Sequence, residues 1–304
     1  MSAAPRILIV GAAGQVGLEL QRSFRGVGEI TAADRETLDL AQPDEIRALV
    51  RRVQPEILLN AAAYTAVDRA EVEPELAMAI NAQAPRVLAE EAARLGALLV
   101  HYSTDYVFDG EKQGPWTEED RPDPLNVYGR SKLAGERAME EVGGRYLIFR
   151  TSWVYGAHGA NFLLTMLRLA QTRERIAVVD DQHGSPTTAI ELANATCAIV
   201  KGAMEGKFGA EENWAGLYQM TCSGETTWCG FARAIFERAG MLLGGKAPIV
   251  IPIASAEYST PARRPRNSVL SNAKLNKVFG VQLAPWEAAL DAVVRELEAQ
   301  SALD

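Results

Sequence analysis

The chain has 304 residues, of which 48% are hydrophobic and 23% charged, and its formal net charge is −8. This ordinary globular composition excludes a disordered or low-complexity chain. The acidic balance argues against nucleic acid as a partner, because proteins that bind it carry a basic face. At about 150 residues per domain the length predicts two domains, which can fold without disulfides or metals.

The cysteines and the N-terminus indicate where the protein works. The three cysteines form no C-x-x-C pair, and the three histidines lack the spacing of zinc ligands. A sparse, odd number of cysteines is typical of a reducing compartment. The first apolar run is too short for a signal peptide, and none reaches the roughly 18 residues of a membrane span. We therefore expect a cytoplasmic protein without a membrane segment.

Strand and helix patterns alternate along the first half of the chain. The predicted elements there are strand 6–10, helix 15–24, strand 29–34, helix 43–53, strand 56–63, helix 74–95, strand 97–104, helix 128–142 and strand 146–151. This alternation is typical of an α/β fold with a doubly wound parallel sheet. The pattern then weakens to helix 161–174, strand 176–179, helix 188–201, strand 217–221 and helix 286–300.

The order of these elements predicts two interleaved domains. We expect residues 1–155 with 190–222 to form a Rossmann-like dinucleotide-binding domain. Residues 156–189 with 223–304 would form a smaller, discontinuous α/β domain that binds the substrate.

Three glycines follow the first strand and begin the first helix: Gly11, Gly14 and Gly17. Such a turn leaves no room for a Cβ, lets the backbone approach a pyrophosphate and presents the N–H groups of a helix start. Asp34 ends the second strand, where a carboxylate can accept the ribose hydroxyls of a dinucleotide. Arg35 beside it can instead neutralise a 2′-phosphate, so the sequence does not choose between NADH and NADPH.

Tyr128 and Lys132 are four residues apart, on one face of a predicted helix. A phenol is a poor acid or base at neutral pH, and a nearby ammonium lowers its pKa. Lys132 can also hold the nicotinamide ribose. Thr104 and Asp105 end the fourth strand, at the edge where open α/β sheets bind ligands. The Thr104 hydroxyl can donate to a substrate carbonyl and stabilise the developing alkoxide.

Beyond these motifs, the chain resembles the dTDP-4-dehydrorhamnose reductase family, within the extended short-chain dehydrogenases/reductases. The matching segments are GAAGQVGLELQR, ILLNAAAYTAVDRAEVEPE, HYSTDYVFDG, PLNVYGRSKLAGE, LIFRTSWVYG, DDQHGSPT and TPARRPRNS. They extend over nearly the whole chain, and STDYVFDG, RTSWVYG and PARRP are the most specific. The resemblance implies that NAD(P)H reduces the C4 ketone of dTDP-4-dehydro-β-L-rhamnose to give dTDP-L-rhamnose.

The motifs and the resemblance together define the expected site. Tyr128 would be the proton donor, Lys132 its activator and Thr104 the partner of the carbonyl. The expected cofactor residues are Gly11, Gly14, Gln15, Val16, Gly17, Asp34, Arg35, Asp39, Leu40, Ala62, Ala63, Tyr64, Thr65, Tyr102, Tyr128 and Lys132. The expected substrate residues are Thr104, Asp105, Tyr128, Trp153, Asn161, Arg263 and Arg264. The two arginines are included because arginine pairs recognise phosphate, of which a dTDP-sugar carries two.

The sequence leaves open whether the protein binds a metal ion and whether it forms a dimer. The resemblance implies that some members form a homodimer through Mg²⁺ held by glutamates. One such position falls on Ile190, with Glu191 one residue away, and a helix turns about 100° per residue. Glu296 in the last predicted helix is a second candidate ligand.

Two other functions also fit parts of the pattern. A nucleotide-sugar epimerase or dehydratase of the same branch would keep NAD⁺ tightly bound and regenerate it. A non-catalytic relative, of the kind that serves as a regulatory subunit of methionine adenosyltransferase, would bind the dinucleotide without turnover. The presence of Thr104, Tyr128 and Lys132 argues against this second alternative.

Overall fold

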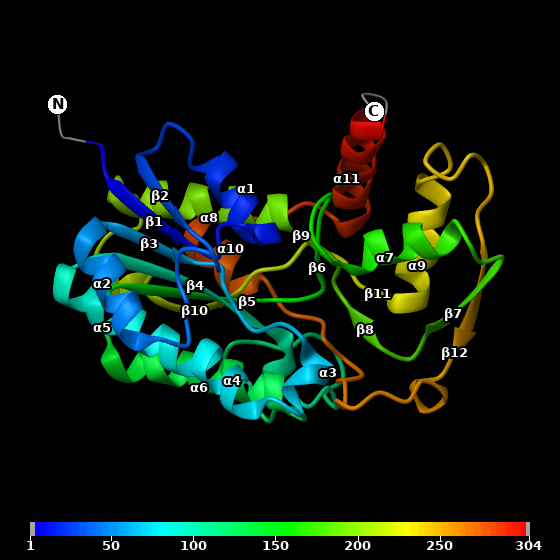
Figure 1. Cartoon of the computed structure of the whole chain (residues 1–304), viewed down its shortest axis with the longest axis horizontal. Coiled ribbons are helices and arrows are strands. Elements are labelled where there is room, and N and C mark those ends of the chain that lie inside the picture. Colours follow the sequence, from blue (N-terminus) through cyan, green and yellow to red (C-terminus); the bar gives the residue numbers. More distant parts are fainter. Residues whose placement is uncertain (1–3, 302–304) are drawn as a thin grey trace.

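The computed structural model describes residues 4–301, and its larger part is a six-stranded parallel sheet (Figure 1). The strands are β1 (Arg6–Val10), β2 (Glu29–Ala33), β3 (Ile57–Asn60), β4 (Leu98–Thr104), β5 (Tyr146–Thr151) and β10 (Gly216–Gln219). Their spatial order is β10-β5-β4-β3-β1-β2. The strands that follow β1 are added on one side as β2 and on the other side from β3 onward. The topological switch point, where such sheets bind ligands, therefore lies between β1 and β3.

Helices cover both faces of this sheet. They are α1 (Gln15–Ser23), α2 (Pro43–Val53), α5 (Ala84–Leu95), α6 (Val127–Val142) and α8 (Ala189–Met204). The short helices α3 (Val67–Ala70) and α4 (Pro74–Met78) pack on α6. Helices α1 and α8 pack together on one face, and α2, α5 and α6 lie side by side on the other (Figure 1). Successive residues of β1 alternate between two apolar cores, with Ile7 and Ile9 in one and Leu8 and Val10 in the other. This confirms the predicted doubly wound sheet.

Two predicted elements differ from the structure. The third strand ends at Asn60, so the alanines that follow it form a loop rather than a strand. The predicted helix 74–95 is interrupted by a π-helical turn, Ala79–Gln83, between α4 and α5. This turn carries the buried Asn81, whose side chain bonds both the N–H and the carbonyl of Tyr64. A local polar contact, invisible in the apolar periodicity, therefore fixes the loop after β3.

The smaller part of the molecule lies beside the carboxyl edge of the sheet (Figure 1). Its helices are α7 (Phe162–Ala170), α9 (Trp228–Arg238) and α11 (Trp286–Ser301), whereas α10 (Ala273–Phe279) packs on β10. Its short strands pair as β6 (Val154–Tyr155) with β9 (Thr187–Thr188), β8 (His183–Gly184) with β11 (Thr226–Thr227), and β7 (Arg175–Val179) with β12 (Ile249–Ile253). The sequence did not predict α9, α10 or β12. Over residues 4–301, no helix has the length and apolarity needed to cross a bilayer.

Candidate active site

The glycine turn after β1 has no space for side chains. Gly11 has φ +80°, and a Cβ built on it would lie 2.6 Å from the backbone nitrogen of Ala62. A Cβ on Gly17 would lie 2.1 Å from the carbonyl oxygen of Gly11. Gly14 is the N-cap of α1, and no side chain caps this helix. The turn therefore presents bare backbone at a helix start, which fits the pyrophosphate of a dinucleotide.

The residues after β2 form the expected adenosine end of this site. Asp34 Oδ1 accepts hydrogen bonds from the Glu36 N–H and the Thr37 hydroxyl, so the carboxylate also shapes its own turn. Arg35 is exposed, Asp39 is exposed, and Leu40 is half-buried. This arrangement leaves the Arg35 guanidinium accessible to an anionic ligand.

The loop after β3 and the ring of Tyr102 are held by polar contacts. Ala62 and Ala63 are half-buried and Thr65 is exposed, whereas the Tyr64 hydroxyl donates to Glu73 at 2.6 Å. The Tyr102 hydroxyl lies 2.7 Å from that of Thr196 on α8. Both tyrosine hydroxyls thus have partners within the protein.

Lys132 is 1% exposed, on the face of α6 that covers β4. Its Nζ donates to the carbonyl oxygen of Tyr102 at 2.6 Å and lies 3.1 Å from His101 Nε2. Burial lowers the pKa of Lys132 to about 8, although nearby Glu136 acts in the opposite direction. The lysine is thus held against β4 one helical turn after Tyr128.

Tyr128 lies in the first turn of α6, where its ring packs edge-on against Tyr106 with centroids 5.6 Å apart. The helix can approach this closely because Gly129 faces the Tyr106 carbonyl, only 2.1 Å from where a Cβ would be. Burial raises the pKa of Tyr128 to about 12, and a hydrogen bond with Thr104 partly opposes the rise. The residue is therefore a neutral phenol at pH 7, the form that can donate a proton.

Thr104 and Asp105 follow directly at the carboxyl end of β4. The Thr104 hydroxyl donates to Asp105 Oδ1 at 3.1 Å and accepts from the Tyr106 N–H. Asp105 is 3% exposed, and burial raises its pKa to about 6 despite hydrogen bonds from neighbouring hydroxyl groups. Tyr128, Thr104 and Asp105, predicted from two separate motifs, are thus brought together.

Trp153 is placed by two distant segments. Its ring stacks on Trp228 of α9, with centroids 3.6 Å apart and planes 10° apart. A Cβ on Gly184 would lie 2.4 Å from Trp153 Cε2, so this ring also lies against the backbone of β8. The backbone of Trp153 has φ +49°, a left-handed conformation that a bulky residue adopts only when its surroundings impose it.

The three remaining predicted substrate residues have different surroundings. Asn161 caps α7, and its Nδ2 donates to the side-chain oxygen of Gln15 at 2.8 Å, so it lies at the glycine turn. Arg264 forms a two-bond ion pair with Asp68. Arg263 is exposed and forms no ion pair within residues 4–301, and its carbonyl accepts from Asn126, the N-cap of α6. The ion pair of Arg264 with Asp68 therefore fixes the segment that contains both arginines, and the Arg263 guanidinium remains available to a phosphate.

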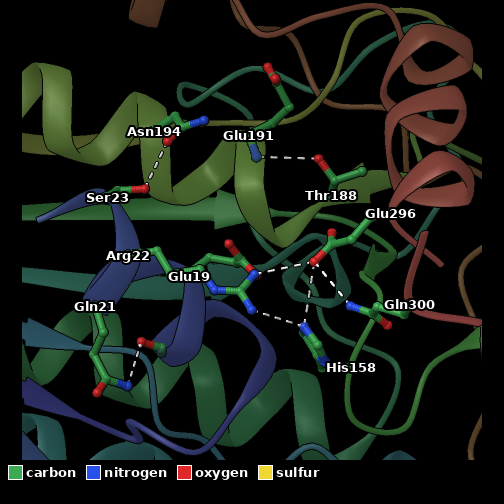
Figure 2. A network of polar contacts seen from close by, with 11 residues as sticks. Glu19, Gln21, Arg22, Ser23, His158, Thr188, Glu191, Asn194, Glu296 and Gln300 are labelled. Carbon is green, nitrogen blue, oxygen red and sulfur yellow. Dashed lines mark hydrogen bonds and ion pairs between the residues drawn. The ribbon is translucent and has the colours of Figure 1, made fainter. Parts of the chain in front are cut away.

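The glutamates considered for a metal do not converge within one chain. Glu191 Oε2 accepts from the Ala284 N–H, and Glu296 lies 3.3 Å from Arg22 and 3.6 Å from His158. Figure 2 shows the Glu191 carboxylate pointing away from that network. The part of the chain that the structure describes contains no group of three or more His, Cys, Asp or Glu suited to a metal ion. Within one chain, these residues therefore do not form a Mg²⁺ site.

Comparison with known proteins decides the family. The family model described as RmlD substrate binding domain matches residues 5–299. The dTDP-4-dehydrorhamnose reductase of Burkholderia thailandensis is 46% identical, covering 97% of this chain and 100% of that protein. That of Escherichia coli K12 is 43% identical, covering 98% and 99%. The chain belongs to the dTDP-4-dehydrorhamnose reductase family.

A solved member of the dTDP-4-dehydrorhamnose reductase family has the same fold. The crystal structure of the enzyme from Bacillus anthracis, in complex with NADP, has a TM-score of 0.87 and 35% identity. The match covers 96% of this chain and 99% of that one. The predicted family and fold class are thus confirmed over nearly the full length.

Several residues that build this reductase-family site were not predicted from sequence. Asn60, His101 and Asn81 are fully buried polar side chains, and Trp228 supports Trp153. Asn60 and His101 are polar residues within apolar strands, which is a usable signal because a buried polar side chain needs a partner. Trp228 offers no such signal, since an aromatic residue in a helix usually belongs to the core.

Proposed function

We propose that this protein uses NADPH or NADH to reduce the C4 ketone of dTDP-4-dehydro-β-L-rhamnose, giving dTDP-L-rhamnose. The observation that carries the proposal is that Tyr128 lies next to Thr104 at the carboxyl end of β4, with Lys132 one turn further along the same helix. The names of its relatives and the NADP complex of the Bacillus anthracis enzyme support the choice of substrate and cofactor.

The proposed catalytic roles follow from protonation state and position. The dinucleotide, when bound, supplies the hydride to the ketone carbon. The Thr104 hydroxyl, which donates to Asp105 in the free protein, would turn to donate a hydrogen bond to the ketone oxygen, where negative charge develops. The Tyr128 phenol would transfer its proton to the resulting alkoxide, since it is neutral at pH 7 and lies next to Thr104. Lys132, buried beside the Tyr102 carbonyl, would hold the nicotinamide ribose.

We further propose which parts of the chain hold the two ligands. The turn Gly11, Gly14, Gln15, Val16 and Gly17 would bind the pyrophosphate, and Asp34, Arg35, Asp39 and Leu40 the adenosine. Ala62, Ala63, Tyr64, Thr65 and Tyr102 would line the channel between them. Asp105 and Trp153 would contact the sugar nucleotide, with Arg263 at its phosphates. Residues 1–155 with 190–222 would thus bind the cofactor, and 156–189 with 223–304 the substrate.

A turnover assay tests this proposal. Enzymatically generated dTDP-4-dehydrorhamnose is offered with NADPH or NADH, and absorbance at the reduced nicotinamide band is followed together with the sugar product. We expect consumption of reduced cofactor in step with dTDP-rhamnose. Purified protein carrying stoichiometric NAD⁺, with no net oxidation of NAD(P)H, would instead indicate an epimerase or dehydratase.

Assembly is a separate proposal. We retain a homodimer as a prediction, to be tested by light scattering of the eluting protein with Mg²⁺ and with a chelator. A monomer under both conditions contradicts it.

A further inference from the structure

Asn60 and His101 form a buried polar pair beneath the catalytic helix. They are register partners on the adjacent parallel strands β3 and β4, and they are 1% and 0% exposed. Asn60 Nδ2 lies 2.9 Å from His101 Nδ1, and His101 Nε2 lies 3.1 Å from Lys132 Nζ. A continuous line of polar contacts therefore leads from β3 to the lysine of the proposed active site.

The direction of this line is set by a backbone group. The N–H of Ala62 can only donate, and it donates to Asn60 Oδ1 at 3.2 Å. The amide nitrogen of Asn60 is thereby turned toward His101, and Nδ1 of His101 must accept. Burial keeps the pKa of His101 well below its usual value, so the ring is neutral and has one N–H. That hydrogen is then on Nε2, facing Lys132.

Lys132 has one other contact in this region, the carbonyl oxygen of Tyr102, to which Nζ donates. An ammonium has three donors and no lone pair, so it would oppose the His101 N–H donor to donor. A neutral amine has a lone pair that can accept it. We propose that Asn60 and His101 form a one-way hydrogen-bond chain that presents a donor to Lys132 Nζ and thereby favours the neutral amine in the free protein.

The other charged groups around Lys132 do not oppose this assignment strongly. Glu136, one turn further on α6, is bound through both oxygens by Arg150 of β5 and also accepts from the Ser103 hydroxyl of β4. Its charge is therefore shared with Arg150, and it raises the pKa of Lys132 less than burial lowers it. Tyr128 is a phenol at pH 7, and the Asp105 carboxylate is buried beyond Thr104. Burial itself lowers the pKa of Lys132, in the same direction as the chain.

The consequence for catalysis rests on the proposed function. By lowering the pKa of Lys132, the hydrogen-bond chain reduces the fraction of ammonium near pH 8, and the ammonium is the form that would draw Tyr128 toward phenolate. His101 and Asn60 are positioning residues in this scheme, because they act through Lys132.

Nuclear magnetic resonance of the free protein, labelled with ¹⁵N at histidine, tests the chain directly. The sequence has three histidines, so His101 can be assigned from the spectrum of His101→Gln. We expect the hydrogen on Nε2 and a pyridine-type Nδ1. A hydrogen on Nδ1 would overturn the proposal, and this result does not depend on any substrate.

A second experiment reverses the direction of the hydrogen-bond chain. In Asn60→Asp the carboxylate can only accept, so it takes both the Ala62 N–H and a hydrogen from His101 Nδ1, and Nε2 becomes an acceptor for an ammonium. We expect the His101 tautomer to change and the Lys132 titration, followed by the ¹³Cε resonance, to move up by at least one pH unit. An unchanged tautomer in Asn60→Asp overturns the proposal.

Val100→Ala is the matched control, because Val100 is a buried neighbour of His101 in the apolar core of the sheet. In Val100→Ala the Lys132 titration should stay within the error of the parent protein. A displacement equal to that in Asn60→Asp would show that the effect is not specific to the hydrogen-bond chain. The pH dependence of kcat/KM should follow the Lys132 titration. If the protein reduces another ketone, the pH dependence of kcat/KM with this substrate is lost, but both magnetic resonance results remain valid. Failure of the proposed function can therefore be distinguished from failure of the hydrogen-bond chain.

Discussion

The Trp153 ring lies flat on the Trp228 ring, with centroids 3.6 Å apart, although one follows β5 and the other begins α9. Trp153 holds this position with a left-handed backbone, φ +49°. Such strain costs on the order of 1–3 kcal/mol and persists when packing over-determines it. The stack therefore joins the carboxyl edge of the large sheet to the smaller part of the molecule and orients an aromatic face there.

Trp228→Ala should weaken binding of the sugar nucleotide more than it slows the chemical step. Without its partner, Trp153 can relax from its strained conformation, and its ring no longer presents a fixed face. We expect KM for the sugar nucleotide to rise about tenfold, which corresponds to roughly 1.4 kcal/mol, with a smaller fall in kcat. Trp228→Phe should retain most of the affinity. Steady-state kinetics that show an unchanged KM in Trp228→Ala would falsify this role for the stack.

Tyr128→Phe should lower kcat by about 10²–10⁴-fold, the usual contribution of a positioned general acid. Only the hydroxyl is removed, so the edge-on packing against Tyr106 remains and the unfolding temperature should change little. Single-turnover reduction measures the step directly. Tyr106→Phe is the control, since Tyr106 packs edge-on against Tyr128 and both residues are half-buried. Near-normal turnover by Tyr128→Phe contradicts the proton-donor role.

Asp105→Asn should stabilise the fold above pH 6. The pKa of Asp105 is about 6 in the folded chain against 3.8 for an ordinary aspartate, so folding favours the protonated acid. The stability that this group contributes is present below pH 3.8 and is lost as the pH rises to 6. At pH 7.5 the buried carboxylate costs up to about 3 kcal/mol, and the amide removes this cost.

Urea denaturation at pH 7.5 and at pH 4 measures the effect of Asp105→Asn. The gain in free energy of unfolding should be present at the higher pH and nearly absent at the lower. Asp123→Asn, at an exposed carboxylate, should show no gain at either pH. An equal gain at both pH values for Asp105→Asn means that ionisation is not its cause. We expect this variant to lose reductase activity.

Gly17→Ala should abolish dinucleotide binding. Its Cβ would meet the Gly11 carbonyl at 2.1 Å, so the turn itself must move. We expect the Kd for NADPH to rise more than about 100-fold, equivalent to roughly 2.7 kcal/mol, as measured by fluorescence of the reduced nicotinamide. Gly240→Ala, where a Cβ meets nothing within 4 Å, is the matched control and should bind normally. Tight binding by Gly17→Ala means that the pyrophosphate does not lie on this turn.

Arg35→Ala should discriminate between the two cofactors. The guanidinium is exposed after β2, next to Asp34, where it can meet a 2′-phosphate. We expect KM for NADPH to rise about tenfold or more, as for loss of one charge-assisted hydrogen bond, with KM for NADH unchanged. Arg25→Ala, another exposed arginine, is the control. Equal effects on both cofactors place Arg35 outside the 2′-phosphate site.

The sequence alone determined the features that depend on local geometry. The glycine spacing after β1 predicted a turn that no Cβ fits, and Tyr128 with Lys132 needed only the 3.6-residue repeat of a helix to share a face. The alternation of buried strands and helices predicted the parallel sheet, because right-handed crossovers leave few topologies open. The predicted position of Thr104 and Asp105 at the end of the fourth strand is confirmed, and this is the edge where such sheets bind ligands.

Only the tertiary structure decided which distant residues meet. The pairing of Asn60 with His101 depends on the register between β3 and β4, and the stacking of Trp153 on Trp228 depends on how α9 packs beside the sheet. The sequence treated Arg263 and Arg264 alike, whereas the fold commits Arg264 to Asp68. Periodicity records whether a side chain faces a core, but contacts between separate elements arise from packing, which no local pattern encodes.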